Sequence, residues 1–319
     1  MGPAPVQLPL IPPMLATAAK RLPPDLEQWA AEVKWDGMRI GAYLDGVGGL
    51  RLLTRDGNQA GPRYPELQEL TAILPHIDAI FDAEVIAPDS DGKPSFGRLQ
   101  ERMGLSRPEA IRAGARRSPV TLMVFDVLWL RGRSLAEMDY EGRREVLEAL
   151  GVAGSRVVTP PAWPGPDARE ALRWTREQGL EGVVLKRLRS AYRAGERSSA
   201  WLKIKHTRTM DILVGGWIPN PAGTRAKALL IGVRDGADLR YVGKVGTGFS
   251  EAERKTLAVL LGPSGVERTP FTAGPAVSTS QPVRFVRPEV TGAVSYLETT
   301  AAGVLRHPVW AGLRSPPSA

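Results

Sequence analysis

A single lysine near the N-terminus is the best nucleophile candidate in the chain. Lys34 lies between Val33 and Trp35 in a segment of alternating apolar residues, and an Asp-Gly pair follows it at 36–37. Lysine side chains are normally charged and hydrated, so this position needs an explanation. Lys34 either lies on the polar face of a half-buried strand that ends in a hairpin turn, or it acts as a nucleophile.

Five further segments with charged residues in strand-like runs follow Lys34 in the sequence. They are 54–57 (Thr-Arg-Asp-Gly), 81–86 (Phe-Asp-Ala-Glu-Val-Ile), 124–128 (Val-Phe-Asp-Val-Leu), 181–186 (Glu-Gly-Val-Val-Leu-Lys) and 201–205 (Trp-Leu-Lys-Ile-Lys). Together with the lysine segment, and in this order, they resemble the motifs of the covalent nucleotidyltransferase superfamily, which contains polynucleotide ligases and mRNA capping enzymes. One such segment is a weak signal, whereas six in order are a specific one.

A second set of segments narrows the resemblance. They are 12–16 (Pro-Pro-Met-Leu-Ala), 95–100 (Ser-Phe-Gly-Arg-Leu-Gln), 192–197 (Tyr-Arg-Ala-Gly-Glu-Arg), 243–250 (Gly-Lys-Val-Gly-Thr-Gly-Phe-Ser) and 305–308 (Leu-Arg-His-Pro). They resemble the ATP-dependent DNA ligases of bacterial end joining, of the ligase C and ligase D type. The resemblance covers nearly the whole chain and leaves no segment for polymerase or nuclease modules, so we expect a stand-alone ligase core.

The resemblance implies an enzyme that seals 5′-phosphate/3′-hydroxyl nicks or breaks in DNA repair. Lys34 would take AMP from ATP, AMP would pass to a DNA 5′-phosphate, and a 3′-hydroxyl would displace it. Each step is a phosphoryl transfer, which depends on positioning and on positive charge. The implied cofactors are ATP, as AMP donor, and Mg²⁺ or Mn²⁺. The implied partners are nicked or broken duplex DNA and Ku-like or polymerase end-joining proteins.

Two lysines near the end of the motif series could supply positive charge. Lys203 and Lys205 are two positions apart in a strand-like run, so both side chains share one face, opposite Leu202 and Ile204. A solvated basic edge is the simpler interpretation. The resemblance implies instead that both lysines contact the α-phosphate and help Lys34 to lose its proton.

Two glutamates are the candidate metal ligands. Glu84 and Glu181 are next to apolar strand residues, where a carboxylate seldom remains unpaired. Mg²⁺ prefers oxygen ligands and often uses only one or two protein carboxylates together with phosphates. In the resembling family the matching glutamates contact the ribose or bind metal, and an ion pair at a strand edge is the alternative.

The resemblance gives four more residues a role around the nucleotide. Phe125 would stack on adenine, unless it is an ordinary core aromatic residue. Arg39 and Arg55 match arginines that bind the nucleotide and the 5′-phosphate of the nick, for which the guanidinium fork is suited. Glu32 would border the nucleotide pocket, mostly through its backbone.

The C-terminus departs from the family pattern. Family members usually end with an arginine followed closely by Asp-Lys, which orient the pyrophosphate leaving group. Here Arg314 is followed by Ser-Pro-Pro at 315–317. We expect Arg314 to contact the nucleotide; either it and Arg306 suffice for the first step, or the protein reacts slowly with ATP.

Composition sets limits on the remaining classes. The 319 residues contain no cysteine, which excludes disulfides and thiolate zinc sites and argues against NAD-dependent bacterial ligases, whose family carries a four-cysteine zinc module. The three histidines are too scattered for a metal site. The sequence has no 18-residue apolar run and no signal peptide, so we expect a soluble, cytoplasmic monomer that does not contact membranes.

The length favours two domains. Alternating helical and strand-like patterns in residues 1–205 predict an α+β nucleotidyltransferase (adenylation) domain, with helices near 64–74, 95–105, 140–150 and 167–178. Residues 206–319 predict a small β-barrel with one helix at 250–261, by resemblance an OB-fold domain, with a hinge at 205–210. Residues 1–205 have 29 basic and 26 acidic residues, a net +3, and residues 206–319 have 13 and 8, a net +5. The second domain is therefore the better candidate to face phosphates.

Two other functions remain open. An RNA ligase or a capping-type nucleotidyltransferase would share the lysine motif, although the second set of segments favours DNA. A non-catalytic nucleic-acid-binding homologue would need only the basic charge and the OB-fold. The presence of Lys34, Glu84, Glu181, Lys203 and Lys205 argues against that alternative.

Overall fold

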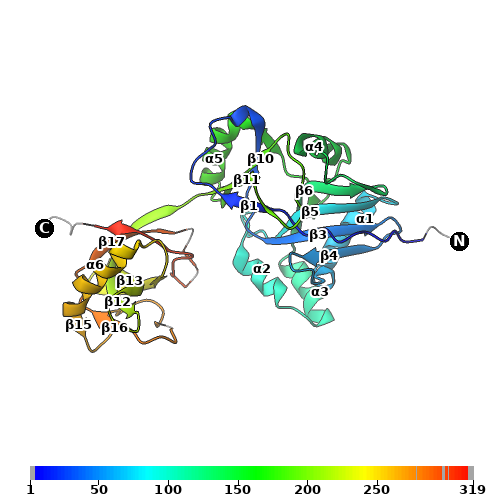
Figure 1. Cartoon of the computed structure of the whole chain (residues 1–319). Coiled ribbons are helices and arrows are strands. Elements are labelled where there is room, and N and C mark those ends of the chain that lie inside the picture. The colour runs from blue at the N-terminus through cyan, green and yellow to red at the C-terminus, as the bar shows by residue number, and fades with distance from the viewer. Residues whose placement is uncertain (1–3, 278, 297–298, 301, 315–319) are drawn as a thin grey trace. The chain divides into compact units, whose positions relative to one another are not determined.

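The chain folds into two compact units, 1–206 and 207–319. The computed structural model describes residues 4–277, 279–296, 299–300 and 302–314. The last strand of the first unit ends at Lys205 and the first strand of the second begins at Arg208. Only His206 and Thr207 therefore lie between these two strands. Figure 1 shows the elements of both units, and each unit is described by itself below.

The first sheet of the N-terminal unit has five strands. Their order is β1 (Leu15–Ala18), β11 (Arg197–Lys205), β10 (Gly182–Arg187), β2 (Trp29–Val33) and β9 (Ala162–Pro164). All of its pairings are antiparallel except that of β1 with β11, which is parallel. Helix α5 (Ala168–Glu177) packs on one face, where Val183, Leu185 and Ile204 are buried. Because side chains alternate along a strand, the neighbours of these residues face the other way.

The second sheet carries the main core of this unit. Its order is β4 (Leu50–Thr54), β3 (Met38–Asp45), β5 (Asp78–Ile86), β6 (Thr121–Leu130) and β7 (Arg133–Ser134), and β8 (Val157–Val158) pairs with β6. Along β5, Phe81, Ala83 and Val85 are fully buried in this core. Alternation then places Asp82 and Glu84 on the opposite face. The remaining helices are α1 (Glu69–Ile73), α2 (Phe96–Met103), α3 (Pro108–Arg117) and α4 (Tyr140–Ala149), with 3₁₀ turns at Leu26–Gln28, Gly61–Arg63, Pro65–Gln68 and Gly165–Asp167.

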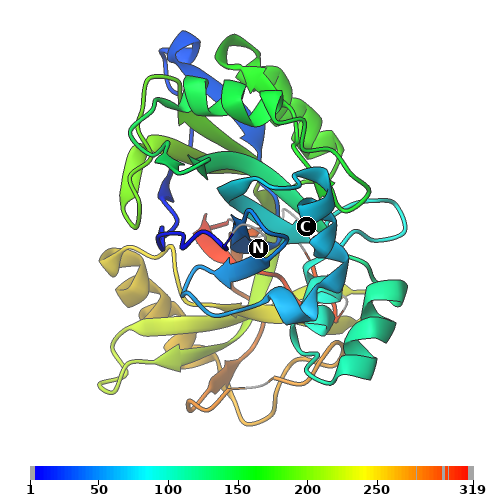
Figure 2. The ribbon, with the colours of Figure 1, turned by 90° about the vertical axis from the view of Figure 1, so that its right-hand side faces the viewer.

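The C-terminal unit is an antiparallel β structure with one α-helix among its described residues. Its strand order is β14 (Asp238–Val245), β13 (Ala226–Asp235), β12 (Arg208–Pro219), β16 (Arg284–Val286) and β15 (Gly265–Val266), and β17 (Thr291–Tyr296) pairs with both β12 and β18 (Val309–Leu313). Helix α6 (Glu251–Leu261), drawn in gold in Figure 2, begins with a capping box between Ser250 and Glu253. Its buried residues Leu257 and Leu261 pack into the core of the unit, and a 3₁₀ turn, Gly262–Ser264, follows it.

Most of the predicted elements are confirmed, with three kinds of exception. The helix predicted over 64–74 is a 3₁₀ turn, Pro65–Gln68, followed by the five-residue α1. Helix α3 was not predicted, and neither were the strands β1, β7, β8, β9, β15, β17 and β18. Of these, β1 and β17 depend on pairings with distant segments. Among the described residues, no helix is both long and apolar enough to cross a membrane.

Candidate active site

The connection between β2 and β3 brings Lys34 to the space between the two sheets of the N-terminal unit. The Lys34 N–H donates to the Gly182 carbonyl at 2.9 Å, which extends the first sheet by one residue. The chain then passes so close to β5 that a Cβ atom on Gly37 would lie 2.2 Å from the Val85 carbonyl oxygen. Only glycine fits there without displacing the backbone. This glycine thus fixes where Lys34 meets the second sheet.

A cavity of about 180 Å³ adjoins Lys34. Seven of the ten predicted site residues line it: Glu32, Lys34, Arg39, Arg55, Glu84, Phe125 and Lys203. Of two others, Glu181 forms an ion pair with Lys34, and Lys205 forms an ion pair with Glu181. Arg314 lies in the other unit, where it pairs with Asp211 at 3.3 Å. The roles of all ten residues stay predictions.

Glu181 bridges two lysines. Lys34 Nζ donates to one of its oxygens at 2.5 Å and Lys205 Nζ to the other at 2.6 Å. Burial by itself would raise the pKa of Glu181, but the two ammonium groups outweigh this effect and lower it. The carboxylate is therefore ionised at neutral pH and holds the two cations together.

Lys203 completes a row of functional groups across the first sheet. Val184 pairs with Glu32 on one side and with Lys203 on the other, so all three side chains share the face that borders the cavity. Burial, and then the nearby charges of Lys205 and Lys34, lower the pKa of Lys203. The nearby carboxylate of Glu181 acts in the opposite direction but does not cancel these effects. The predicted shared face of Lys203 and Lys205 is confirmed by the burial of Ile204 on the other side.

Glu84 faces the cavity from the second sheet. Among the described residues, no side chain or backbone group makes a hydrogen bond or ion pair with its carboxylate. Burial raises the pKa of Glu84 to about 8, although the charges of Arg39 and Lys34 act in the opposite direction. At neutral pH this carboxyl group is therefore mostly protonated in the ligand-free protein.

Glu32 is only 3% exposed, and its side chain is already engaged. Its carboxylate accepts a hydrogen bond of 2.5 Å from the Tyr140 hydroxyl and an ion pair of 2.9 Å from Lys186. Lys186 also donates to the Phe125 carbonyl oxygen at 3.0 Å. The carboxylate therefore anchors a buried lysine in the wall of the cavity.

The ring of Phe125 is 8% exposed and lies among cations. The Arg39 guanidinium is 4.8 Å and Lys186 Nζ is 4.7 Å from its centroid. Such cation–π contacts hold the ring in place. The adjacent Asp126 forms a fully buried bidentate ion pair with Arg143, at 2.8 and 3.0 Å, which fixes the backbone next to Phe125.

Sequence reasoning missed several residues of the cavity: Lys186, Trp201 and Arg197 line it, and Asp82 holds Arg39. Lys186 ends the Glu-Gly-Val-Val-Leu-Lys segment, and Trp201 begins the Trp-Leu-Lys-Ile-Lys segment. Their pairing in adjacent strands places them on the same face as Lys203. Strand alternation from Lys203 could have identified Trp201, since the two residues are two positions apart.

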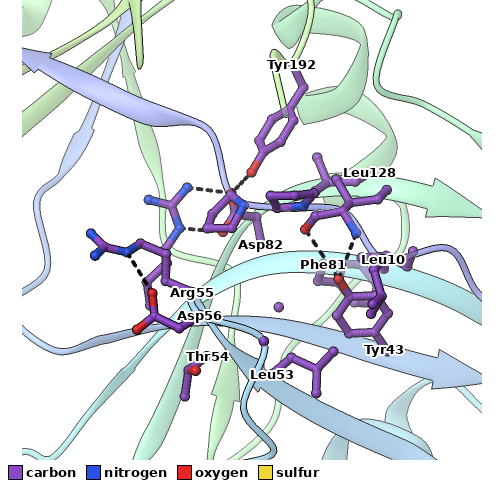
Figure 3. A pocket seen from close by; sticks show the side chains of 17 residues that line it. Leu10, Tyr43, Leu53, Thr54, Arg55, Asp56, Phe81, Asp82, Leu128 and Tyr192 are labelled. Atoms are coloured by element: carbon purple, nitrogen blue, oxygen red, sulfur yellow. Dashed lines mark hydrogen bonds and ion pairs between the residues drawn. The ribbon is translucent and has the colours of Figure 1, made fainter. Parts of the chain in front are cut away.

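A second cavity, of about 300 Å³, lies beside the first. Figure 3 shows its lining, with Tyr43, Leu53, Leu128 and Tyr192 around it. Arg39 and Arg55 line both cavities. Within the described residues, no cluster of three or more metal-ligating side chains is present.

Comparison with known proteins identifies the family. Residues 13–205 match the model of the ATP dependent DNA ligase domain, and residues 222–316 match that of the ATP dependent DNA ligase C terminal region. The multifunctional non-homologous end joining protein LigD of Mycolicibacterium smegmatis is 40% identical over 304 residues, which are 95% of this chain and 38% of that protein. The corresponding DNA repair protein LigD of Mycobacterium tuberculosis H37Rv is 36% identical over the same shares. The chain thus spans well under half the length of these relatives.

Two solved structures resemble the whole chain. One, described as mycobacterial DNA ligase D complexed with ATP and MES, is 34% identical with a TM-score of 0.57, covering 97% of this chain and 96% of that one. The other, the ligase domain of M. tuberculosis LigD, is 33% identical with a TM-score of 0.55, covering 95% of each. They confirm the predicted fold class, an α+β nucleotidyltransferase domain followed by an OB-fold-type domain. This chain belongs to the ATP-dependent DNA ligase family.

Proposed function

We propose that this protein is a DNA ligase that seals 5′-phosphate/3′-hydroxyl nicks or breaks through a lysyl-AMP intermediate on Lys34. The observation that carries the proposal is the grouping of Lys34 with Lys203, Lys205, Glu84 and Glu181 beside one cavity. Phosphoryl transfer requires little of a protein except a positioned nucleophile and positive charge around the phosphates. This cavity supplies both.

The geometry suggests how the steps would proceed. In the first step, Lys34 Nζ loses a proton and bonds to the α-phosphorus of ATP, while the bond from that phosphorus to pyrophosphate breaks. In the second step, an oxygen of the DNA 5′-phosphate takes AMP from Lys34, which recovers a proton. In the third, the 3′-hydroxyl oxygen attacks the DNA phosphorus, loses its proton, and AMP departs. Lys203 and Lys205 would stabilise the α-phosphate in all three steps, because both side chains lie on the face of β11 that borders the cavity.

The carboxylates fit a divalent cation. Glu84 has no partner among the described residues and Glu181 lies close enough for their charges to interact, and oxygen donors are what Mg²⁺ prefers. In our proposal Glu84 and Glu181 would hold Mg²⁺, or Mn²⁺, together with phosphate oxygens of ATP. When bound, the ion would neutralise phosphate charge. Arg39 and Phe125 would bind the adenosine part from the wall of the cavity, and Glu32 would border it.

DNA would engage both units. Arg55 is well exposed at the edge of the cavity, with its side chain 63% accessible, so it can reach the 5′-phosphate of a nick. The second unit has the higher density of positive charge, so affinity should fall steeply with salt as counterions are released. We further propose that the protein acts in end joining, as the name of its LigD relative suggests. In this proposal it is a cytoplasmic monomer with Ku-like or polymerase partners.

Adduct formation tests the proposal directly. Wild-type protein incubated with ATP and Mg²⁺ should gain the mass of one AMP in intact mass spectrometry, and Lys34→Ala should not. Lys20→Ala, which removes an exposed lysine outside the cavity, is the matched control and should form the adduct normally. An adduct of full yield in Lys34→Ala would refute the mechanism.

The polynucleotide is tested separately. Nicked duplexes with DNA or RNA on either side of the nick should be sealed fastest when the template and the 5′-phosphate strand are DNA. Sealing of an all-RNA nick at the same rate would favour the RNA ligase alternative. An adduct with no sealing of any nick would favour a capping-type activity.

A further inference from the structure

Arg39 is held by contacts that leave one nitrogen free for a ligand. Its Nε and Nη2 donate to the two oxygens of Asp82, both at 2.5 Å, and Nη2 also donates to the Met14 carbonyl at 3.2 Å. Among the described residues, Nη1 has no hydrogen-bond partner. The same guanidinium lies over Phe125 and lines the proposed nucleotide cavity. Its orientation therefore decides what Nη1 can contact.

The Asp82 carboxylate is itself oriented by a buried tyrosine. The Tyr192 hydroxyl donates to Asp82 at 2.5 Å and accepts a hydrogen bond of 2.9 Å from the Met14 N–H. Tyr192 is 2% exposed, and its ring packs edge-on against Trp201 at 5.6 Å between centroids. Burial and the charge of Asp82 raise the pKa of Tyr192 well above its ordinary value. The hydroxyl thus keeps its proton and remains a donor to Asp82.

The second cavity explains why such a hold is needed. Arg39, Asp82 and Tyr192 all line this space of about 300 Å³, whereas Glu84 and Lys34 line only the first cavity. Figure 3 shows the Tyr192 hydroxyl directed at Asp82 beside it. A guanidinium that lost its carboxylate partner would have room to turn into this space, away from the nucleotide cavity. The Arg39 side chain is 24% exposed and rests on the rings of Phe125 and Trp201, so dense packing does not fix its orientation on the side of the second cavity.

We propose that Tyr192 is a positioning residue for the nucleotide: by fixing Asp82, it keeps the Arg39 guanidinium turned toward the nucleotide cavity. The inference rests on the proposed function, because it takes ATP as the ligand that Arg39 meets. Tyr192 touches no reacting atom and acts only through Asp82. Its loss should weaken ATP binding in the ground and transition states alike, which raises KM and leaves kcat nearly unchanged.

The test compares two tyrosines of the same cavity. Tyr192→Phe removes the hydroxyl that bonds to Asp82. Tyr43→Phe removes a hydroxyl that bonds only to the backbone of Ile11, at 3.2 and 3.3 Å, and so also loosens the N-terminal segment. The rate of adduct formation is measured for each variant over a range of ATP concentrations, and thermal unfolding is followed in parallel.

Tyr192→Phe should raise the KM for ATP by roughly tenfold, with kcat within about threefold of wild type, as expected for loss of one positioned charged contact. Tyr43→Phe should leave both constants within about twofold. Equal KM values in the two variants would overturn the inference, whereas a wild-type protein that forms no adduct would overturn only the proposed function. These two failures are therefore distinguishable.

A double-variant cycle separates positioning from general destabilisation. Asp82→Asn should by itself raise KM at least as much as Tyr192→Phe, since it weakens the hold on Arg39 directly. If Tyr192 acts through Asp82, adding Tyr192→Phe to Asp82→Asn should change KM by less than about twofold. If the KM increases of the two single variants multiplied in the double variant, Tyr192 would not act through Asp82. This comparison holds even if Tyr192→Phe alone proved unstable.

Discussion

The ammonium group of Lys34 donates a 2.5 Å hydrogen bond to the carboxylate of Glu181, a residue 147 positions away in the sequence. The second oxygen of this carboxylate accepts from Lys205. One ionised glutamate thus holds together two cations that would otherwise repel each other. The cluster is present without any ligand, and in the proposed function phosphate oxygens of ATP would replace the carboxylate as partner of either lysine.

Glu84→Gln should stabilise the ligand-free protein, and the effect should depend on pH. The pKa of Glu84 rises from 4.5 to about 8 on folding. Between these values the folded state holds a proton that the unfolded chain has lost, so stability falls as the pH rises through this window. Glutamine does not titrate. The difference in Tm, variant minus wild type, should therefore grow from pH 5 to pH 8, without metal or ATP.

The control for this prediction is Glu109→Gln, which changes a carboxylate that is 78% exposed. Its effect on Tm should vary little with pH. A Tm difference for Glu84→Gln that stays constant from pH 5 to pH 8 would contradict the inferred state of Glu84.

Gly37→Ala should disrupt the approach of the Lys34 segment to β5. The added Cβ would lie 2.2 Å from the Val85 carbonyl oxygen and 2.9 Å from Glu84 Cγ, so backbone must move. We expect a loss of unfolding free energy of about 1–3 kcal/mol, as for other overpacked sites, and slower adduct formation.

Gly97→Ala is the control, because nothing lies within 4 Å of a Cβ atom added at this position in α2. Gly97→Ala should raise the unfolding free energy of the protein by about 0.5–1 kcal/mol, because alanine is favoured over glycine in a helix. Urea unfolding measures both variants.

Arg143→Met should be among the most destabilising single changes in the first unit. Arg143 and Asp126 are 0% and 1% exposed, so the variant leaves an unpaired buried carboxylate next to Phe125. The expected cost is about 3–5 kcal/mol in urea unfolding. Arg112→Met removes an arginine that pairs with Glu109 at the surface and should cost under about 1 kcal/mol. Similar losses of unfolding free energy for both variants would contradict the buried ion pair between Arg143 and Asp126.

Arg314→Ala should slow adenylation by roughly a hundredfold, as loss of one preorganised charge contact at a leaving group often does. The later steps should be spared. The comparison uses a nick with ATP and a nick that already carries 5′-AMP. Arg287→Ala, which removes another exposed arginine of this unit with a carboxylate partner, is the control. Equal slowing on both substrates would mean that Arg314 acts on DNA or on folding; no slowing on either would mean that this chain does not need it.

The residues that follow Arg314 differ from the pattern expected of the family. Residues 315–317, which replace the expected Asp-Lys pair, lie outside the described residues. In the structure Arg314 pairs with Asp211, so an acidic partner comes from β12 rather than from the neighbouring sequence.

The sequence by itself determined the order of the motifs, the family and much of the local structure. Alternation along 201–205 was enough to place Lys203 and Lys205 on one face, because side-chain direction in a strand depends only on position. The helix predicted at 250–261 was likewise readable from its own residues, and the structure places it at 251–261. Strands β1 and β17 were not, because distant partners stabilise them.

Only the tertiary structure decided which charges meet. Tyr192 and Asp82 are 110 positions apart, and Tyr140 and Glu32 are 108 apart, yet both pairs are in contact at 2.5 Å. No local pattern encodes such pairs, since they arise where segments distant in sequence pack together around the cavities. Burial there makes an unpaired polar group costly, so most polar groups have a partner, which the fold determines. Among the described residues Glu84 is an exception.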